Sequence, residues 1–346
     1  MKRIFTLMMV FIASVMFVQA QVESHLEVVA EFSTRPGNVA VSKDGRVFTS
    51  MHPLGTSELQ LVEITGKNSI EPFPSIDYQN STGTPSNDKL DTPLGIRIDK
   101  NDILWLIDMG QNLGKTRLFA FDITTKKEVF RFDFPEEIAP KGSFIQDVAV
   151  DEKNGWVYLA DIANPGIIVL NTKTKEARRF ADETVQAEKI DMVIDGKLIH
   201  FGGAPASVAV NPITLSDDRN TLYYGAMNGT TWYKVPATLF REGANDYTIS
   251  NAIKVAGPKP VSDGVATDTN GNHYFTNLQH DGIDVLTNAG ELKPLYRSEK
   301  IDWADNVALD SKGWIYVTVN QLHKTPAFTG GKDEGQAPFY IYRFKL

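Results

Sequence analysis

The chain has 346 residues, of which 42% are hydrophobic and 10% aromatic, so it is long enough and apolar enough to bury a large core. Its formal net charge is −8 and it has no basic run, which argues against a nucleic acid or an anionic membrane as partner. Cysteine is absent, which excludes disulfides, a thiolate nucleophile and Cys-ligated zinc. We expect a monomer whose partner is a small molecule.

The first twenty residues predict a secretory signal peptide. Lys2 and Arg3 form a positive start, residues 4–18 are apolar, and Ala20 is the small residue expected before a cleavage site. The apolar stretch is shorter than the about 20 residues of a spanning helix, although an uncleaved N-terminal anchor is the alternative. We therefore expect cleavage after Ala20, a secreted or periplasmic location and no membrane contact afterwards, with residues 21–346 forming one domain.

A strand–turn–strand pattern occurs six times at intervals of about 40–60 residues. In each unit, an amide, acidic or small residue opens a run of alternating apolar residues, a polar turn follows, and a second strand is rich in aromatic and β-branched residues. The six units begin at Asn38, Gly95, Asp147, Ser207, Gly264 and Asn306. The fourth unit has a longer expected turn, from Pro212 to Asn220. The repeat predicts an all-β fold, a six-bladed β-propeller.

The two ends of the chain predict how the ring of blades closes. After Asn320 a single further strand is recognisable, at residues 339–344, so the sixth blade lacks one strand. Residues 26–32 precede the first unit and have the alternation of an outer strand. We expect this N-terminal strand to complete the last blade, which would remove an exposed sheet edge.

The antiparallel pairing within each unit places two rings of polar residues at one mouth of the central channel. The start of the first strand and the end of the second strand meet there. The inner ring comprises Asn38, Gly95, Asp147, Ser207, Asp263 with Gly264, and Asp305 with Asn306, and the outer ring comprises His52, Asp108, Asp161, Asn228, Asn277 and Asn320. The residues expected to bind a ligand are Asp108, Asp147, Asp161, Asn277, Asp305, Asn306 and Asn320.

Carboxylate and amide oxygens at one mouth leave several functions open. They suit a hard cation such as Ca²⁺, and they equally suit an organic ammonium group beside aromatic side chains. No cofactor is certain. His52 is a candidate general base at the mouth. The alternative is that Asp and Asn side chains satisfy turn backbones, in a propeller that binds other proteins and no small ligand.

From Asn101 onward the chain resembles the major royal jelly protein/Yellow family. The resemblance is carried by Leu104-Trp-Leu-Ile-Asp-Met-Gly110, Gln146-Asp-Val-Ala-Val-Asp151, Tyr158-Leu-Ala-Asp161 and Ile301-Asp-Trp-Ala-Asp305. It implies a secreted six-bladed propeller. Some relatives are linked to dopachrome conversion and some bind small amines in the channel, so the resemblance implies an amine or catechol-like ligand and a tautomerase-like activity. Insect members of the family commonly contain paired cysteines, and this chain has none, so it looks like a bacterial relative.

A second stretch, Ser262-Asp-Gly-Val-Ala-Thr-Asp268, is similar to the Asp-Gly segment of the more distant gluconolactonase/SMP-30 propellers. That resemblance implies a metal-dependent lactonase in which Asp263 binds the catalytic metal, with Asp147 and Asn306 as further ligands. The bound cation would polarise an ester carbonyl and activate water. The family also supplies a Glu before the first inner strand, where this chain has Thr34-Arg-Pro-Gly-Asn38 and no carboxylate.

Overall fold

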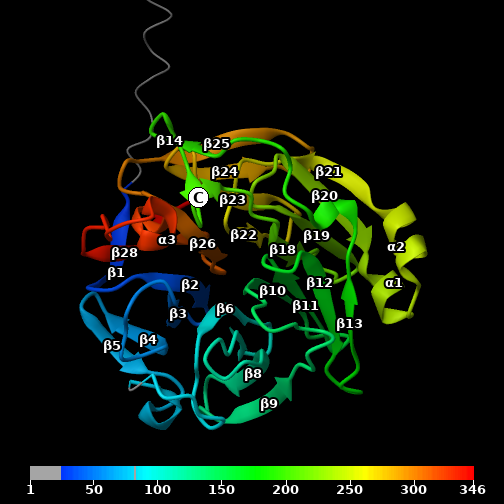
Figure 1. The fold of residues 1–346 in the computed structure, drawn as a ribbon, viewed down its shortest axis with the longest axis horizontal. Coiled ribbons are helices and arrows are strands. Elements are labelled where there is room, and N and C mark those ends of the chain that lie inside the picture. The colour runs from blue at the N-terminus through cyan, green and yellow to red at the C-terminus, as the bar shows by residue number, and fades with distance from the viewer. Residues whose placement is uncertain (1–24, 82) are drawn as a thin grey trace, which may run out of the picture.

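The computed structural model describes residues 25–81 and 83–346, which form six four-stranded antiparallel sheets around a central axis (Figure 1). The predicted six-bladed β-propeller is confirmed. The predicted signal peptide and its cleavage site after Ala20 lie outside the described residues. None of the helices in the described part has the length and apolar character needed to span a bilayer.

The blades follow one another along the chain, each with its first strand at the axis (Figure 1). Blade 1 has β2 (Pro36–Val41), β3 (Val47–Met51), β4 (Leu61–Gly66) and β5 (Ser69–Pro72); blade 2 has β6 (Pro93–Ile98), β7 (Ile103–Asp108), β8 (Arg117–Asp122) and β9 (Glu128–Asp133). Blade 3 has β10 (Ile145–Asp151), β11 (Trp156–Asp161), β12 (Gly166–Asn171) and β13 (Ala177–Phe180); blade 4 has β18 (Val210–Leu215), β19 (Thr221–Ala226), β20 (Thr231–Pro236) and β21 (Lys254–Pro258). Blade 5 has β22 (Val265–Thr267), β23 (His273–Asn277), β24 (Gly282–Leu286) and β25 (Leu292–Arg297).

The sixth blade is shared between the two ends of the described chain. It contains β26 (Ala304–Leu309), β27 (Trp314–Val319) and β28 (Phe339–Lys345), and its outer strand is β1 (Glu27–Phe32). β1 pairs antiparallel with β28, with Phe32 opposite Phe339. In Figure 1 the blue β1 accordingly lies beside the red β28. The predicted closure by the N-terminal strand is confirmed, and β28 is paired on both sides, with β27 and with β1.

Alternating residues of the strands form a separate apolar cluster between each pair of neighbouring blades. At the axis, small side chains on the inner strands face aromatic residues on the second strands. The pairs are Ala40 with Phe48, Ala149 with Tyr158, Ala266 with Tyr274, and Ala308 with Tyr316. Alanine keeps the inner strands close together, while the aromatic ring fills the wider space farther out.

The fourth blade corrects one prediction from the sequence. Its inner strand spans Val210–Leu215, so the expected start at Ser207 and the expected turn beginning at Pro212 are both wrong. Pro212 lies in a break of register between Val210 and Ile213, where the ladder does not need its missing N–H group. The strand therefore continues past the proline, and the turn contains residues 216–220.

Segments outside the blades cover the mouth at which the inner strands begin. The insertion between blades 3 and 4 contains η2 (Glu183–Val185) and two small hairpins, β14 (Val193–Ile194) with β15 (Lys197–Leu198) and β16 (His200–Phe201) with β17 (Ala204–Pro205). It packs with η3 (Leu322–Lys324) and α3 (Pro326–Thr329) in one apolar cluster around Trp303. We call residues 190–208 and 322–328 the cap. The remaining helices, η1 (Ile76–Tyr78), α1 (Ala237–Arg241) and α2 (Asp246–Ala252), belong to the connections of other blades.

Candidate functional site

The candidate site is built from irregularities in the inner strands. Register breaks occur in five of the six, and the residues they displace are Gly37 with Asn38, Leu94 with Gly95, Gln146, Asn211 with Pro212, and Asp305. A β-bulge re-aims side chains that would otherwise follow the alternation of the strand. Three of the displaced polar residues, Asn38, Gln146 and Asn211, hydrogen-bond to residues outside their own blades.

Asp263 lies at the centre of this network. One carboxylate oxygen, Oδ1, accepts hydrogen bonds from the amides of Gln146 at 2.5 Å and Asn211 at 2.6 Å, and Oδ2 accepts one from the indole N–H of Trp303 at 2.8 Å. These three donors come from blades 3, 4 and 6. Asn38 of blade 1 extends the network by donating to the backbone oxygen of Gln146. The network therefore spans the channel between blades that are not adjacent in sequence.

Asp305 forms the second part of the site, with Asn320 and His52. The Asn320 amide donates to Oδ2 of Asp305 at 2.6 Å, and His52 Nε2 lies 3.7 Å from the same oxygen. The N–H of Leu54 donates to Nδ1 of His52, so the neutral ring carries its proton on Nε2 and points it at Asp305. Burial lowers the pKa of His52 to about 3. His52 is thus neutral, its buried Nε2–H has no hydrogen-bond partner among the described residues, and its low pKa makes it a weaker base than the one expected from the sequence.

Asp147 is the third buried carboxylate. Its Oδ1 accepts from the N–H of Val148, and Oδ2 lies 3.5 Å from the N–H of Ile213. Arg97 is the nearest cation, with 4.0 Å between Nη2 and Oδ1. Burial raises the pKa of Asp147 to about 6 even though the Arg97 charge opposes this. In the described part of the chain, Asp147 thus has no hydrogen bond to the side chains around Asp263 and Asp305, but its charge affects their pKa values.

Burial raises the pKa values of the three carboxylates, and neighbouring carboxylates add to the effect at Asp263 and Asp305. Burial raises the pKa of Asp263 well above its usual range, and the charge of Asp305 adds to the effect. Burial also raises the pKa of Asp305 to about 7, with a contribution from Asp147. Within residues 25–81 and 83–346, no Lys or Arg forms an ion pair with Asp263 or Asp305. Like charges without a counter-ion favour the protonated forms.

Several buried oxygens at this mouth have no hydrogen-bond partner. They are Oδ1 of Asn38, Asn211, Asp305 and Asn320. Leaving a buried acceptor unsatisfied costs about 1–3 kcal/mol, so such atoms require an explanation. All four are acceptors, and they lie among residues that already hydrogen-bond to Asp263, Asp305 or their neighbours. His52 Nε2, a donor, is also buried without a hydrogen-bond partner at this mouth. The unpartnered atoms named here are thus four acceptors and one donor, and a cation or a group with several donors would satisfy the acceptors.

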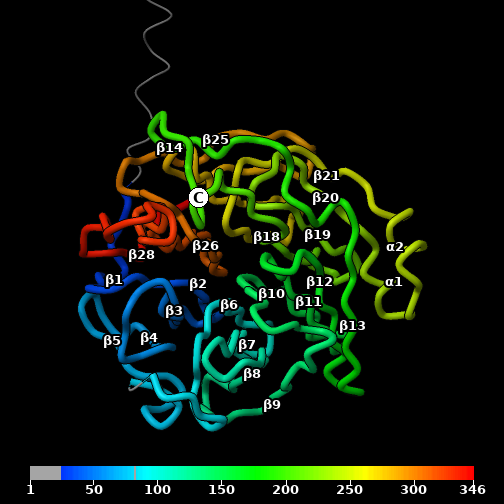
Figure 2. Tube along the Cα trace, in the orientation of Figure 1, coloured from blue at the N-terminus to red at the C-terminus, as the bar shows by residue number. Residues whose placement is uncertain are grey.

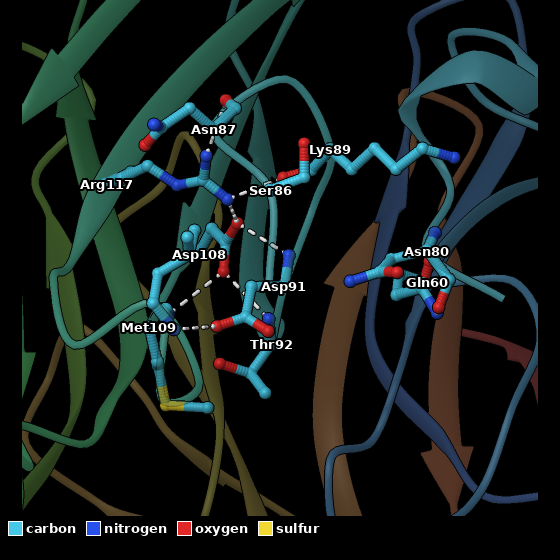
Figure 3. Close-up of polar contacts among 12 residues, drawn as sticks. Gln60, Asn80, Ser86, Asn87, Lys89, Asp91, Thr92, Asp108, Met109 and Arg117 are labelled. Atoms are coloured by element: carbon cyan, nitrogen blue, oxygen red, sulfur yellow. Dashed lines mark hydrogen bonds and ion pairs between the residues drawn. The ribbon is translucent and has the colours of Figure 1, made fainter. Parts of the chain in front are cut away.

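Three of the expected ligand-binding residues lie outside this cluster. Asp108 accepts from the N–H groups of Asp91 and Thr92 and forms a buried ion pair with Arg117 at 2.5 Å (Figure 3). Asp161 likewise pairs with Arg179 at 2.6 Å. The third, Asn277, donates to Asp284 within blade 5. Each of these side chains holds a turn of its own blade, which is the alternative that the sequence left open.

Of the other expected residues, Asn320 belongs to the cluster and Asn306 has a structural role. Asn320 joins the cluster, whereas Asn306 accepts the N–H of Val39 and so links blades 6 and 1. The sequence reasoning missed Asn211 and Gln146. Asn211 was hidden by the shifted register of the fourth unit, but an amide directly before Pro212 was a visible sign of a bulge.

Comparisons with known proteins agree with this fold. The major royal jelly protein family model matches residues 92–342, more than half of the chain. Major royal jelly protein 1 of Apis mellifera is 26% identical over 214 residues, covering 56% of this chain and 46% of that protein. Protein yellow of Drosophila melanogaster is 24% identical over 242 residues, covering 64% and 42%.

Among solved structures, a gluconolactonase from Xanthomonas campestris superimposes with a TM-score of 0.56 at 11% identity, covering 93% of this chain and 90% of that one. This likeness concerns the propeller fold. The matched segments span about half the length of these curated relatives or less. On the strength of the family match over residues 92–342, the chain belongs to the major royal jelly protein family.

Proposed function

We propose that this protein binds a small molecule carrying a protonated amine, or a catechol-like group rich in donors, at the Asp263–Asp305 cluster. The observation that carries the proposal is the set of unpartnered buried acceptors beside carboxylates with no cationic partner among the described residues. A primary ammonium group supplies a positive charge and three N–H donors, which is what such a cluster lacks. Membership of the major royal jelly protein family agrees with a propeller of this kind.

Binding of an ammonium group would be coupled to loss of protons from the cluster. Because their pKa values are raised, Asp147 and Asp305 are partly protonated near pH 6–7 when no ligand is bound. A bound cation replaces those protons because it stabilises the ionised carboxylates. Affinity for an amine should therefore increase as the pH rises from 5 to 8, while the affinity of a neutral catechol should change less.

A tautomerase-like activity would use Asp305 and His52. Tautomerisation moves a proton between two atoms of the substrate, and it is fastest with a base whose pKa is near the working pH. Asp305, with a pKa of about 7, meets this requirement, and the Nε2 proton of His52 is directed at the same carboxylate. We assign proton transfer to Asp305 and hydrogen-bond donation to His52 within this proposal.

The alternative of a metal-dependent lactonase fits the residues less well. Oxygen donors are suitable for Ca²⁺, but both oxygens of Asp263 already accept N–H hydrogen bonds. The described residues contain no group of three His, Cys, Asp or Glu side chains placed to hold a metal ion. Asp147 and Asn306, the other expected ligands, are bonded to backbone N–H groups of Ile213 and Val39.

The proposal is tested on residues 21–346 by calorimetry with a panel of an arylalkylamine, a catechol, a catecholamine and an uncharged aryl alcohol, after the metal content has been measured. We expect the amines to bind with a stoichiometry of one and the aryl alcohol not to bind. Asp305→Asn should weaken amine binding about tenfold or more, since it removes a charge-assisted contact. Asp77→Asn, an exposed acid, serves as the charge-matched control.

Two results would overturn the proposal. One is that no amine or catechol binds at millimolar concentration. The other is a stoichiometric divalent ion whose removal by chelation abolishes lactone hydrolysis, which would favour the lactonase. Conversion of dopachrome, followed by its visible absorbance, tests the catalytic part separately, because Asp305→Asn should abolish turnover whereas Asp77→Asn should not.

A further inference from the structure

We propose that the opposite end of the channel is a second ligand site, which binds a small organic carboxylate with an apolar body. A cavity of about 690 Å³ opens there, and its lining includes residues from all six inner strands. These strands converge at the axis in Figure 2. The volume falls within the about 300–1,000 Å³ typical of small-molecule pockets.

The wall of this cavity, which we call the lower funnel, combines polar and charged residues of the hairpin turns with an apolar part formed by the inner strands. One side chain from each of several blades contributes to it, among them Val41, Ile98, Val150, Leu215 and Leu309. The indole of Trp314 lies at its rim. This apolar part can bury the hydrocarbon or aromatic body of a ligand.

Arg97 supplies the charged group in the lower funnel. Its Nε and Nη2 atoms approach the backbone oxygens of Val148 and Val265 at 3.5 Å, and Nη2 lies 4.0 Å from Asp147. All three distances are at or beyond the upper limit of a good hydrogen bond. Nη1 has no partner among the described residues, and the side chain is 26% exposed. The guanidinium group thus retains donors for a ligand.

The other cations that line the lower funnel are already paired. Lys100 lies 2.7 Å from Asp217, Lys43 lies 2.7 Å from Asp102, and Arg219 contacts Glu152 through two hydrogen bonds. The acids there are also occupied. The carboxylates of Asp99, Asp268 and Asp310 accept N–H groups of their own hairpin turns. Lys43 and Lys100 keep further N–H donors but are mostly exposed, whereas Arg97 lies on an inner strand and has no acid partner among the described residues closer than 4.0 Å. Arg97 is therefore the cation best placed to bind an anion inside the funnel.

The repeat shows that the fold does not require an arginine at this position. The residues at the same place in the inner strands of blades 1, 3, 5 and 6 are Ala40, Ala149, Ala266 and Ala308, each opposite an aromatic residue. Arg97 stands opposite Trp105 in blade 2. A guanidinium group placed among small apolar side chains loses hydration without gaining close partners, which favours a role in binding.

The guanidinium group selects the class of ligand. Its planar donors match a carboxylate, which can accept two parallel N–H hydrogen bonds. The surrounding acids of the rim disfavour multiply charged anions by repulsion. A monocarboxylate with an apolar tail or ring therefore fits the lower funnel better than inorganic phosphate does.

The test uses residues 21–346 and measures binding of phenylacetate, hexanoate, acetate and inorganic phosphate by NMR titration. We expect saturable binding of phenylacetate and hexanoate and much weaker binding of acetate and phosphate. Arg97→Ala introduces the residue found in four other blades, so the variant should fold. It should weaken phenylacetate binding about tenfold or more, and Arg97→Lys should lose less. Lys127→Ala, an exposed site, controls for the change in net charge.

Three results would overturn this proposal. The first is the absence of saturable binding of either apolar carboxylate. The second is an equal loss in Lys127→Ala and Arg97→Ala, which would show that net charge alone matters. The third is that Asp305→Asn abolishes phenylacetate binding as Arg97→Ala does, because the two ends of the channel would then form one site.

Discussion

Two sets of buried aspartates at one mouth of the propeller have different surroundings. The outer aspartates, Asp108 and Asp161, end the second strands of their blades, and each is neutralised by an arginine of its own blade. The inner aspartates, Asp263 and Asp305, lie at the start of inner strands and have no such partner among the described residues. Burial and residue type are therefore the same in both sets, and the counter-ion distinguishes a structural carboxylate from a candidate ligand-binding one.

The largest expected effect is loss of an outer carboxylate. Asp108→Asn should lower the free energy of unfolding by about 3–5 kcal/mol, because Arg117 would remain buried without its counter-charge. Urea denaturation of residues 21–346 at pH 7 would measure this. A change below about 1 kcal/mol would mean that the contacts of Arg117 with backbone oxygens suffice, and the comparison of the two sets would fail.

The raised pKa values of the inner carboxylates should make the stability of the protein fall as the pH rises. Burial raises the folded-state pKa of Asp147 to about 6 from an ordinary value of 3.8. Its contribution is fully present below about pH 4 and is lost as the pH rises through 6. Between pH 4 and 8, the wild type should lose about 3 kcal/mol more stability than Asp147→Asn, as measured by denaturation at each pH. Parallel pH profiles of the two proteins would contradict the raised pKa.

The close approach of the inner strands can be tested at Gly264. A Cβ atom there would lie 2.8 Å from both the Cα of Asn306 and the backbone oxygen of Asp305. Gly264→Ala should destabilise the protein by about 1–3 kcal/mol through overpacking, and should also weaken amine binding. Gly331→Ala is the control, because a Cβ atom there would meet nothing within 4 Å. Thermal unfolding of both variants measures this, and equal melting temperatures would show that the inner strands can move apart to accept the added methyl group.

The smallest effect on stability should come from an inner carboxylate. Asp305→Asn at pH 5 should change the free energy of unfolding by less than about 1 kcal/mol, because the wild-type side chain is then protonated and nearly isosteric with the amide. Denaturation at pH 5 measures this. A loss comparable to that of Asp108→Asn would show that Asp305 is structural, and the proposed ligand site would lose its main support.

Most of the fold could be predicted from local pattern, and the exception is instructive. Six units with alternating apolar residues and Gly- or Asn-containing turns predicted the blades, and the missing outer strand predicted the pairing of β1 with β28. The fourth unit was misplaced because residues 207–211 also alternate, so period alone did not distinguish the two registers. The bulge at Asn211 and Pro212 depends on pairing with β19, which lies later in the chain.

The candidate site was less predictable. The antiparallel pairing predicted that both rings lie at one mouth, but it did not predict which side chains contact one another. Asp161 and Asp305 both lie at strand ends, yet one pairs with Arg179 and the other with Asn320. The repeat predicts strands and turns, but it does not predict which aspartate pairs with an arginine of its own blade. Gln146 was invisible for the same reason, since its bond to Asp263 crosses the channel.

The sequence by itself determined the number of blades, the alternation of their strands and the presence of acids at the ends of the inner strands. These features follow from local periodicity and turn chemistry, which act over a few residues. The tertiary structure decided which aspartates are neutralised, which amide oxygens remain unpartnered and where Arg97 projects. The outer aspartates are neutralised by arginines of their own blades, whereas the amide oxygens at the axis are surrounded by atoms from blades far apart in the chain. In both places the charge of each group depends on burial and on the neighbours that folding brings to it.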